Sequence, residues 1–560
     1  MGIGLILVEK GLISRDQLEK ALAAQRESGE RLDRVLVRLG FVSRNQVLAA
    51  LGDQFQMPVV DLGSLSPSRE VLETLPPKLV YRQSCVPIDR HNGTLTVATS
   101  DPFEITALDE LRLLTGCSIE LVLADEDELN KFIRAHYGVG GDTLDQLSSD
   151  RRQEVVAVEG PADEIEQAQE ASVIKLVNDI LVEAVSERAT DVHIEPYEHE
   201  LVVRYRIDGV LQRANVPPTI NRFGAAIVSR LKIMANLNIA EKRKPQDGRI
   251  TFTHRPPNGP AQEFDLRMSV IPMLFGEGVV LRVLSKTAVL MSLDDLGMDE
   301  LTLRRWDELI NRPHGIVLVT GPTGSGKSTT LYASLNRIVS DEIKVITVED
   351  PVEYHVPMVN QIQVNAKTGL TFAAGLRSIL RHDPDVVMVG EIRDKETAEV
   401  AIQASLTGHL VFSTLHTNDA AGATTRLLDM GVEPFLVSSS LEGVLAQRLV
   451  RRVCMECAQP YTPAHDELPP DFIPTPDDRP LRGAGCRACR NTGFRGRVGV
   501  YELLRLTPHT REMIMERRNA PVIAAKAIED GDLRLLKDDG YEKFRRGLTT
   551  LSEVARALST

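Results

Sequence analysis

A glycine-rich segment follows a short apolar run in the middle of the chain. The run reads GIVLVT and the segment that follows it reads GPTGSGKS, which has the spacing G-x-x-x-x-G-K-S. In a phosphate-binding loop of this kind, backbone N–H groups surround a polyphosphate, the lysine contacts its β- and γ-oxygens, and the hydroxyl binds Mg²⁺. A predicted strand before the motif and a predicted helix after it give the required context, whereas a simple glycine-rich turn needs neither. We therefore expect a nucleoside triphosphate site formed by Gly321, Pro322, Thr323, Gly324, Ser325, Gly326, Lys327, Ser328 and Thr329, with Ser328 at Mg²⁺.

Two predicted strands downstream of this loop end in carboxylates. They read KVITVED and DVVMVGE. Ligands of a parallel α/β sheet bind at the carboxyl ends of its strands, and a triphosphate with Mg²⁺ needs acidic groups for the metal shell and for the attacking water. We expect Glu391 to act as general base or to position water, and Glu349 to be the metal-side or polarising carboxylate; a solvated strand end is the alternative for each. The other carboxylates of this set are Asp350, Glu353 and Asp385.

Histidines and arginines supply further candidates. His409 and His416 flank the buried run LVFSTL, where a neutral imidazole can sense a γ-phosphate by hydrogen bonding and pass the change to a subunit interface, or serve only a structural role. Phosphoryl transfer also gains from a cation that reaches the γ-phosphate from another subunit or domain, although most arginines are surface or ion-pair residues. The candidate arginines are Arg204, Arg206, Arg267, Arg282, Arg377 and Arg381.

Four of the six cysteines form two C-x-x-C pairs on either side of a proline-rich stretch. The pairs are Cys454 with Cys457 and Cys486 with Cys489. Four thiolates in this spacing predict a closed tetrahedral Zn²⁺ site, which would be structural because it leaves no position for a substrate. Two redox-active C-x-x-C pairs are the alternative.

The bulk properties limit the classes of protein. A chain of 560 residues predicts three to four domains, and a formal charge of −14 argues against a nucleic-acid groove as the main surface. No segment approaches the roughly 18 uninterrupted apolar residues that a membrane-spanning helix needs, and the first residues lack the basic start and cleavage site of a signal peptide. We therefore expect a cytoplasmic protein.

The N-terminus contains an internal repeat of two helix-turn-helix units, residues 5–25 and 34–54. Glycines end the first helix of each unit, and a Ser-x-x-Gln capping box begins the second. Changes in composition then predict the remaining boundaries. The expected parts are a helical module at 1–60, a small α/β part at 61–137, a flexible acidic linker at 138–171, a second α/β domain at 172–285, a connector at 286–297 and a P-loop domain at 298–560 with a zinc-binding insertion at about 450–500.

The blocks GPTGSGKST, VITVEDPVEY, DPDVVMVGEIRD and LTGHLVFSTLHTND, with the four-cysteine insertion, resemble those of the secretion-ATPase superfamily. Within it, the chain resembles the GspE-type ATPases of type II secretion. The resemblance implies an α/β multidomain protein in which a PAS-like α/β domain and an N-terminal helical plus α/β module precede a RecA-like hexameric motor. It also implies Glu349 in the Asp box, Glu391 as catalytic glutamate, His409 and His416 in the His box, and Arg267, Arg282, Arg377 and Arg381 near nucleotide across closing interfaces.

The N-terminal repeat is similar to the tandem motif of cyclic-di-GMP-binding domains. Arg31 matches the opening arginine of the second copy, but Asp33 replaces a glycine and Gly2 stands where the first copy has arginine. These departures weaken stacking on a guanine base and the close backbone approach that glycine permits. The resemblance to GspE proteins implies instead a docking module for the cytoplasmic domain of an inner-membrane, GspL-like protein.

The expected function is a hexameric, Mg²⁺-dependent ATPase that drives pseudopilus assembly and protein export. The resemblance further implies a GspF-like platform protein and an anionic inner-membrane surface as partners, and no nucleic acid. The alternatives are a PilB-type pilus extension motor, which has the same catalytic blocks, a RecA-like nucleic-acid motor, and a nucleotide-dependent scaffold without turnover.

Overall fold

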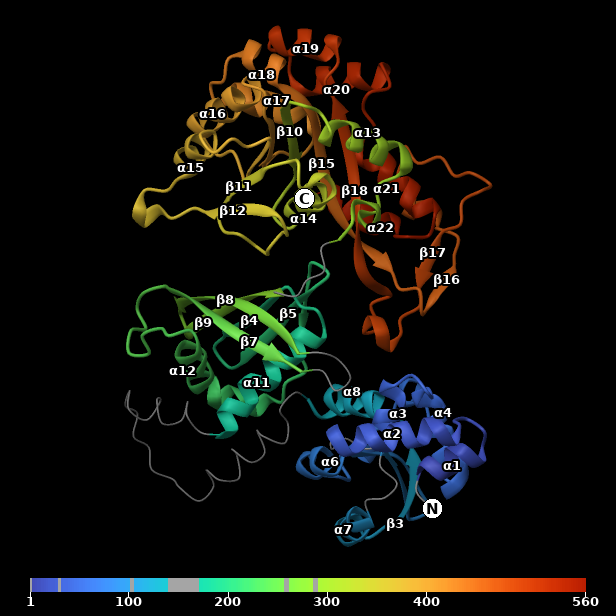
Figure 1. Cartoon of the computed structure of the whole chain (residues 1–560). Helices are drawn as coiled ribbons and strands as arrows, with labels where there is room; N and C mark the ends of the chain where they lie inside the picture. Colours follow the sequence, from blue (N-terminus) through green and yellow to red (C-terminus); the bar gives the residue numbers. More distant parts are fainter. Residues whose placement is uncertain are drawn as a thin grey trace. The chain divides into compact units, whose positions relative to one another are not determined.

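The structure, a computed structural model, describes residues 3–28, 32–100, 105–138, 171–255, 261–285 and 291–559. The chain divides into two compact units, Met1–Ser285 and Lys286–Thr560 (Figure 1). The predicted linker at 138–171 lies almost wholly outside the described residues. Gly2, Arg31 and residues 286–290 of the predicted connector also lie outside the described residues. The expectations for these residues therefore stay predictions.

The repeated helices of the N-terminus are present as predicted. Gly11 and Gly40 adopt φ of 67° and 71° after the first helix of each repeat, a left-handed conformation that glycine takes without strain. The Ser14 and Ser43 hydroxyls then accept hydrogen bonds from backbone N–H groups three residues on, at 3.2 and 3.3 Å. The helices are α1 (Ile3–Glu9), α2 (Arg15–Ser28), α3 (Leu32–Arg38) and α4 (Arg44–Phe55).

A three-stranded sheet follows the helical repeat. Strands β1 and β2 are antiparallel and turn at Asn92 and Gly93, both at positive φ, while β2 and β3 are parallel. Cys85 and Cys117 are buried in its core rather than available as reactive thiols. The elements are α5 (Arg69–Leu72), α6 (Pro77–Gln83), β1 (Cys85–His91), β2 (Thr94–Thr99), α7 (Ile105–Thr115), β3 (Ser118–Leu123) and α8 (Glu126–Tyr137).

The rest of the first unit is a six-stranded antiparallel sheet with helices α11 and α12 against one face. Its strand order is β6-β5-β4-β9-β8-β7. Alternation of apolar and polar residues, as in QEFDLRMSV, places one face of each strand in the core and the other face outward. The elements are α11 (Ala171–Ser186), β4 (Asp191–Pro196), β5 (Leu201–Ile207), β6 (Val210–Arg213), α12 (Gly224–Met234), β7 (Gln246–His254), β8 (Gln262–Met273) and β9 (Gly276–Ser285).

The second unit is built on a seven-stranded sheet of order β12-β11-β13-β14-β10-β15-β18. All neighbouring strands are parallel except the edge pair β15 and β18. Its strands are β10 (Gly315–Thr320), β11 (Val345–Glu349), β12 (Val359–Gln363), β13 (Val386–Val389), β14 (Leu410–Leu415), β15 (Leu441–Val453) and β18 (Phe494–Arg505).

Helices cover both faces of this sheet, which is why its strands read as continuous apolar runs. Every residue of β10 is buried: Ile316 and Leu318 belong to the core shared with α15 to α18, and Val317 and Val319 to the core shared with α13 and α14. The helices are α13 (Glu300–Ile310), α14 (Lys327–Ile338), α15 (Phe372–Ile379), α16 (Lys395–Leu406), α17 (Ala420–Asp429), α18 (Pro434–Ser440), α19 (Pro508–Met515), α20 (Ala520–Glu529), α21 (Leu536–Arg545) and α22 (Leu551–Leu558).

The cysteine-containing insertion is an excursion between β15 and β18. These two strands stay paired as far as Val453 and Phe494, so the excursion is narrower than the predicted 450–500. It contains the short pair β16 (Ala458–Pro460) and β17 (Leu481–Gly483), and its Phe472 packs against Phe544 of α21 in a small core.

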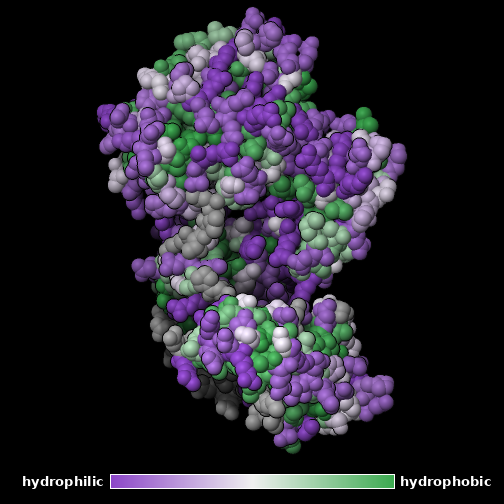
Figure 2. Space-filling view, turned by 45° about the vertical axis from the view of Figure 1, so that its right-hand side comes forward, coloured by the Kyte–Doolittle hydropathy of each residue, from purple (hydrophilic) through white to green (hydrophobic). Residues whose placement is uncertain are grey.

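No described helix is long and apolar enough to cross a membrane. On the face drawn in Figure 2, hydrophilic residues cover most of the view and apolar residues lie between them in smaller groups.

A buried carboxyl group joins three elements of the second unit. Glu502 on β18 accepts hydrogen bonds from the backbone N–H of Ala420, at 2.8 Å, and of Leu536, at 3.2 Å, at the starts of α17 and α21. Burial raises the pKa of Glu502 to about 7, helped by the charge of Asp419, and outweighs these N–H groups and Arg448.

We predict that Glu502 makes this unit less stable as the pH rises. The folded state binds the proton more tightly than the unfolded state, so stability is greatest below the unfolded pKa of 4.5 and falls as the pH rises towards 7. Thermal and urea unfolding between pH 5 and 8 should show the wild type lose on the order of 2 kcal/mol of unfolding free energy relative to E502Q, which does not titrate. A difference that does not change with pH, as we expect for the exposed control E529Q, would contradict this.

Candidate active site

The phosphate-binding loop connects β10 to α14 and lies against β15. Gly321 and Gly326 have φ of 146° and 91°, and a Cβ atom there would lie 2.5 Å from the backbone oxygen and 2.7 Å from the side-chain nitrogen of Gln447, respectively. Glycine is thus required at both positions by the close approach of β15 as well as by the backbone conformation. The loop backbone is thereby held at the end of the strand, before α14 begins.

Lys327 is the first residue of α14 and turns back over the loop. Its Nζ donates to the backbone oxygens of Gly321, at 2.8 Å, and Pro322, at 3.0 Å. Burial lowers its pKa to about 8, with a contribution from Arg448 and against the effect of Glu391. The Ser325 hydroxyl is buried and has no hydrogen-bond partner among the described residues. A lysine whose charge is weakly compensated and an unpaired hydroxyl both fit a bound phosphate.

Glu349 ends β11 and is 4% exposed. Its carboxylate accepts a short hydrogen bond from the Tyr332 hydroxyl, one of 2.6 Å from Thr347 and one of 3.1 Å from the Gln361 amide. Burial and the charge of Glu349 raise the pKa of Tyr332, so the hydroxyl remains a donor. Three donors from α14, β11 and β12 fix the position of this carboxylate.

Glu391 lies just beyond the end of β13. Its carboxylate forms a close ion pair with Arg393, and its Oε2 is 3.4 Å from Nε2 of His416, which follows β14. The Glu391 side chain is 14% exposed and that of His416 is 51% exposed. A carboxylate and an imidazole from neighbouring strands therefore face each other where solvent can enter.

These groups line one cavity of about 150 Å³. It brings the phosphate-loop cation and hydroxyl together with the carboxylates of two strand ends and the histidine of a third, as the order of the parallel strands requires. The predicted site residues that line it are Lys327, Ser328, Glu349, Asp350, Glu353, Glu391 and His416. A cation, a hydroxyl and several carboxylates around one opening can bind a Mg²⁺-triphosphate and orient a water molecule.

The structure places other predicted residues elsewhere. His409 lies at the opposite end of β14 from His416, where Nδ1 is 2.9 Å from the Ala404 backbone oxygen. Asp385 likewise precedes β13, and its carboxylate accepts from the backbone N–H of Lys344 at 2.7 Å. Neither residue lines the cavity, because each precedes its strand, while the cavity lies where the strands end.

The predicted arginines do not line the cavity either. Arg377 on α15 pairs with Glu396 at 2.7 Å, and Arg381 bonds to the backbone oxygen of Arg377 at 2.8 Å. Arg267 and Arg282 face each other across β8 and β9 of the first unit, together with the Asp191 carboxylate, 3.3 Å from Arg282. Arg204 and Arg206 lie in the same sheet, on β5.

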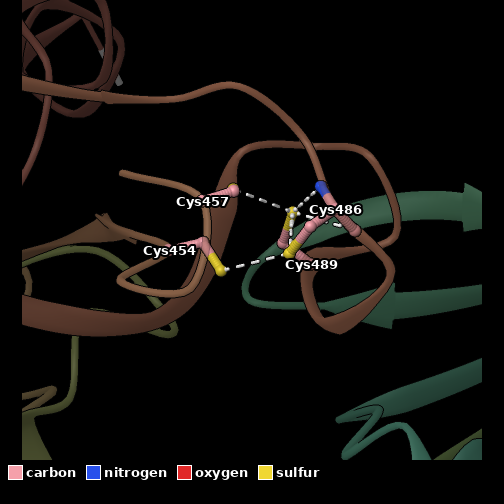
Figure 3. A group of neighbouring side chains, drawn as sticks. All are labelled: Cys454, Cys457, Cys486 and Cys489. Atoms are coloured by element: carbon pink, nitrogen blue, oxygen red, sulfur yellow. Dashed lines mark hydrogen bonds between the residues drawn. The ribbon is translucent and has the colours of Figure 1, made fainter. Parts of the chain in front are cut away.

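The four cysteines converge as their spacing predicts (Figure 3). Their sulfur atoms lie within 4.8 Å of one another. Three sulfur–sulfur distances are 3.7 to 3.8 Å, and four thiolates about 2.3 Å from a central tetrahedral ion are about 3.8 Å apart. The donor set therefore fits a tetrahedral metal ion, with two ligands from each end of the excursion.

Several residues of the site were not predicted from the sequence. They depend on packing between distant segments, except Thr347 and Arg393, which stand two residues before Glu349 and two residues after Glu391 and had a local signal. The others have ordinary local sequence contexts. These residues are Tyr332, Thr347, Gln361, Arg393, Gln447 and Arg448.

Comparison with known proteins identifies the family. The sequence profile described as "Type II/IV secretion system protein" matches residues 166–556, which include the whole second unit except its last four residues. The chain belongs to this family. It is an ATPase of the secretion type, as the GspE-like motifs predict. The profile of the MshEN domain matches residues 55–143, after most of the helical repeat.

Two relatives that match almost the whole chain are named for two different systems, type IV pilus assembly and type II secretion. The chain is 42% identical to a type IV pilus assembly ATPase PilB of Myxococcus xanthus, covering 99% of this chain and 98% of the relative. It is 41% identical to a type II secretion system protein E of Xanthomonas campestris, covering 98% and 97%. A type II secretion system protein E of Pseudomonas aeruginosa is 47% identical over 81% of this chain and 90% of that protein.

Among solved structures, the Legionella pneumophila ATPase DotB superposes with a TM-score of 0.51. It is 22% identical and covers 68% of this chain and 95% of its own. This likeness shows the fold: the second unit has a RecA-like core, as predicted, with a four-cysteine excursion.

We predict that Tyr332 positions Glu349 for catalysis. In Y332F the carboxylate keeps two of its three donors, so nucleotide binding should be nearly unchanged while kcat falls about tenfold, because misplacement of a charged group affects mainly the transition state. Steady-state ATP hydrolysis gives kcat and KM. The control Y541F removes a hydroxyl bonded to Asp471 at 3.0 Å away from the cavity, and equal kcat values for the two variants would contradict the role of Tyr332.

Proposed function

We propose that Glu391 orients or deprotonates the water that attacks the γ-phosphate of ATP. Lys327 would contact the β- and γ-oxygens, Ser328 would bind Mg²⁺, and Glu349 would hold water of the metal shell. The observation that carries this proposal is the single cavity lined by all four residues. Bound Mg²⁺ would neutralise charge that develops on the phosphates.

Glu391 is held by Arg393 as well as by His416. The guanidinium of Arg393 lies against the carboxylate that would have to face the attacking water, so hydrolysis requires Arg393 to release it. A γ-phosphate carries more negative charge than one carboxylate and attracts a guanidinium more strongly. Binding of ATP would therefore draw Arg393 away from Glu391. His416, at the same opening, is placed to contact the γ-phosphate and to signal its loss.

We further propose that the chain works as a homohexamer. Arg377 and Arg381 are exposed on the second unit, where they can reach a neighbouring subunit, and Arg267 and Arg282 are paired across two strands of the first unit. A cation supplied across an interface would couple hydrolysis to movement of one unit against another. The full-length match to secretion and pilus ATPases supports a motor of this kind.

The work driven by this motor is pseudopilus assembly and protein export by a type II secretion system. Relatives named type II secretion system protein E from several bacteria support this choice. A PilB-type motor for type IV pilus assembly is the second candidate, favoured by the 42% identity over 99% of the chain. Both candidates share the catalytic chemistry and differ in the filament that they extend.

The N-terminal part would dock on the cytoplasmic domain of a GspL-like inner-membrane protein, with a GspF-like platform protein and anionic lipid as further contacts. Such docking would hold the motor in the cytoplasm at the inner membrane. The exposed polar faces of the helical repeat support docking rather than insertion. Binding of cyclic-di-GMP by the repeat stays an alternative prediction, since Arg31 and Gly2 lie outside the described residues.

We propose that the four cysteines bind one structural Zn²⁺ ion. The ion would join the two ends of an excursion that contributes Phe472 and few other buried apolar residues to a small core shared with α21 and α22. All four ligands come from protein, so the site supplies no catalytic position.

The variant E391Q tests hydrolysis. We expect ATP binding to persist and kcat to fall at least about a hundredfold, because the amide cannot accept the proton of the attacking water. The measurements are ATP turnover and binding of a fluorescent ATP analogue, with and without vesicles of anionic phospholipid, and light scattering for the oligomer. E399Q, an exposed carboxylate on α16, is the matched control.

Equal turnover in E391Q and E399Q would contradict the role of Glu391. Binding without turnover in wild type would favour the scaffold, and stimulation by single-stranded DNA but not by lipid would favour a nucleic-acid motor. Expression of E391Q in the source cells separates the two filaments: loss of protein export with normal surface pili supports secretion, and the reverse supports pilus assembly.

The zinc proposal predicts one ion per chain by elemental analysis. C486S should lose the ion and lower the melting temperature, because three thiolates leave the tetrahedral site open. C117S removes a buried cysteine of the N-terminal part and should keep the ion. Absence of zinc from freshly purified wild type, or full zinc content in C486S, would contradict the proposal.

A further inference from the structure

Strand β15 continues beyond the point where β10 ends. Thr320, the last residue of β10, pairs with Ala446, and β15 then runs on to Val453. The next two residues of β15, Gln447 and Arg448, therefore lie beside the phosphate-binding loop. Both side chains are buried. Successive side chains of a strand point to opposite faces, so Gln447 and Arg448 can contact different segments of the chain.

Gln447 contacts the phosphate-loop side. Its side-chain oxygen accepts a hydrogen bond of 2.7 Å from Thr330 on α14. Its backbone oxygen lies against Gly321, at the position where a Cβ of that glycine would be 2.5 Å away. The backbone of β15 is thus in direct contact with the loop.

Arg448 joins that contact to the segment that carries His416. Its Nη1 donates to the Gln447 backbone oxygen at 3.1 Å, and its Nη2 donates to the Asn418 backbone oxygen at 2.9 Å. The same segment is held from the other side, because the Thr417 backbone N–H donates to the Thr320 hydroxyl at 2.9 Å. Residues 416–418 are therefore fixed between the end of β10 and the guanidinium of Arg448.

The guanidinium of Arg448 is buried without an ion pair among the described residues. The residue is 4% exposed, and its Nε has no hydrogen-bond partner among the described residues. The described structure gives the guanidinium hydrogen bonds to backbone carbonyls and no ion pair, although Glu502 and Asp419 act on it at longer range. Burying a cation without a paired carboxylate is costly, so an arginine at this position is poorly explained by stability alone.

We infer that Arg448 is a positioning residue for ATP hydrolysis, which holds the Thr417–Asn418 backbone against the phosphate-binding loop so that His416 faces Glu391. Lysine cannot reproduce this bridge, because the two carbonyls are reached by separate nitrogens of one planar guanidinium. The inference rests on the proposed role of Glu391 and His416, and it adds a residue that touches neither nucleotide nor Glu391.

The test compares R448K and R448M with wild type. Both variants should bind a fluorescent ATP analogue within about threefold of wild type and show a KM for ATP changed by a similar factor, while kcat falls about tenfold in R448K and further in R448M. Circular dichroism and thermal unfolding report folding. If R448M does not fold, R448K, which keeps the charge and most of the volume, gives the decisive values.

Two controls separate positioning from a merely structural role. R451M removes another arginine of β15, which is paired with Glu553, and should lower the melting temperature while the kcat of the folded protein stays at the wild-type value. In an H416A background R448K should reduce kcat by less than twofold further, because both changes act through the same segment. Full activity of R448K, or effects of R448K and H416A that multiply, would overturn the inference. Failure of E391Q to reduce kcat would instead overturn the proposed function.

Discussion

The active site depends on the parallel alignment of four adjacent strands. Parallel strands end at the same edge of a sheet, so the residues that follow β10, β11, β13 and β14 meet in space although they are far apart in sequence. The loop after β10 provides phosphate-binding groups, and the ends of β11, β13 and β14 provide Glu349, Glu391 and His416. The apolar strands, buried on both faces, keep this edge rigid.

Buried polar groups collect close to this edge. Glu349 accepts three hydrogen bonds, Glu502 accepts two from backbone N–H groups, and Arg448 donates two to backbone oxygens. Each of these arrangements has a desolvation cost that apolar residues would avoid, and each fixes a segment that borders the cavity or supports it. These buried polar groups therefore lower stability through desolvation, and they fix the positions of the groups that would contact the nucleotide.

The sequence predicts those parts of the site whose chemistry is local. The phosphate-binding loop, the strand-end carboxylates and the paired cysteines could be read from short motifs, and the capped helices of the N-terminal repeat from single residues such as Gly40 and Ser43. His409 shows the limit of this approach. It stands next to the same strand as His416, but seven residues along an extended strand separate the two by about 20 Å.

Residues whose roles arise only from packing could not be predicted. Tyr332 points from α14 to Glu349, and Arg448 reaches Asn418 across thirty residues of sequence, with no motif that marks either one. The cysteine excursion is likewise bounded by pairing between distant segments, because β15 and β18 continue the main sheet as far as Val453 and Phe494.

The most direct test of this account is a structure of the protein with Mg²⁺ and a non-hydrolysable ATP analogue. We expect Lys327 to leave the backbone oxygens of Gly321 and Pro322 for the β- and γ-phosphates, Ser328 to bind the metal ion, and Glu391, released from Arg393, to contact a water molecule in line with the γ-phosphate. Triphosphate bound elsewhere, or bound here with Lys327 still on the loop and Glu391 still paired with Arg393, would contradict the central claim that this strand edge is the catalytic site.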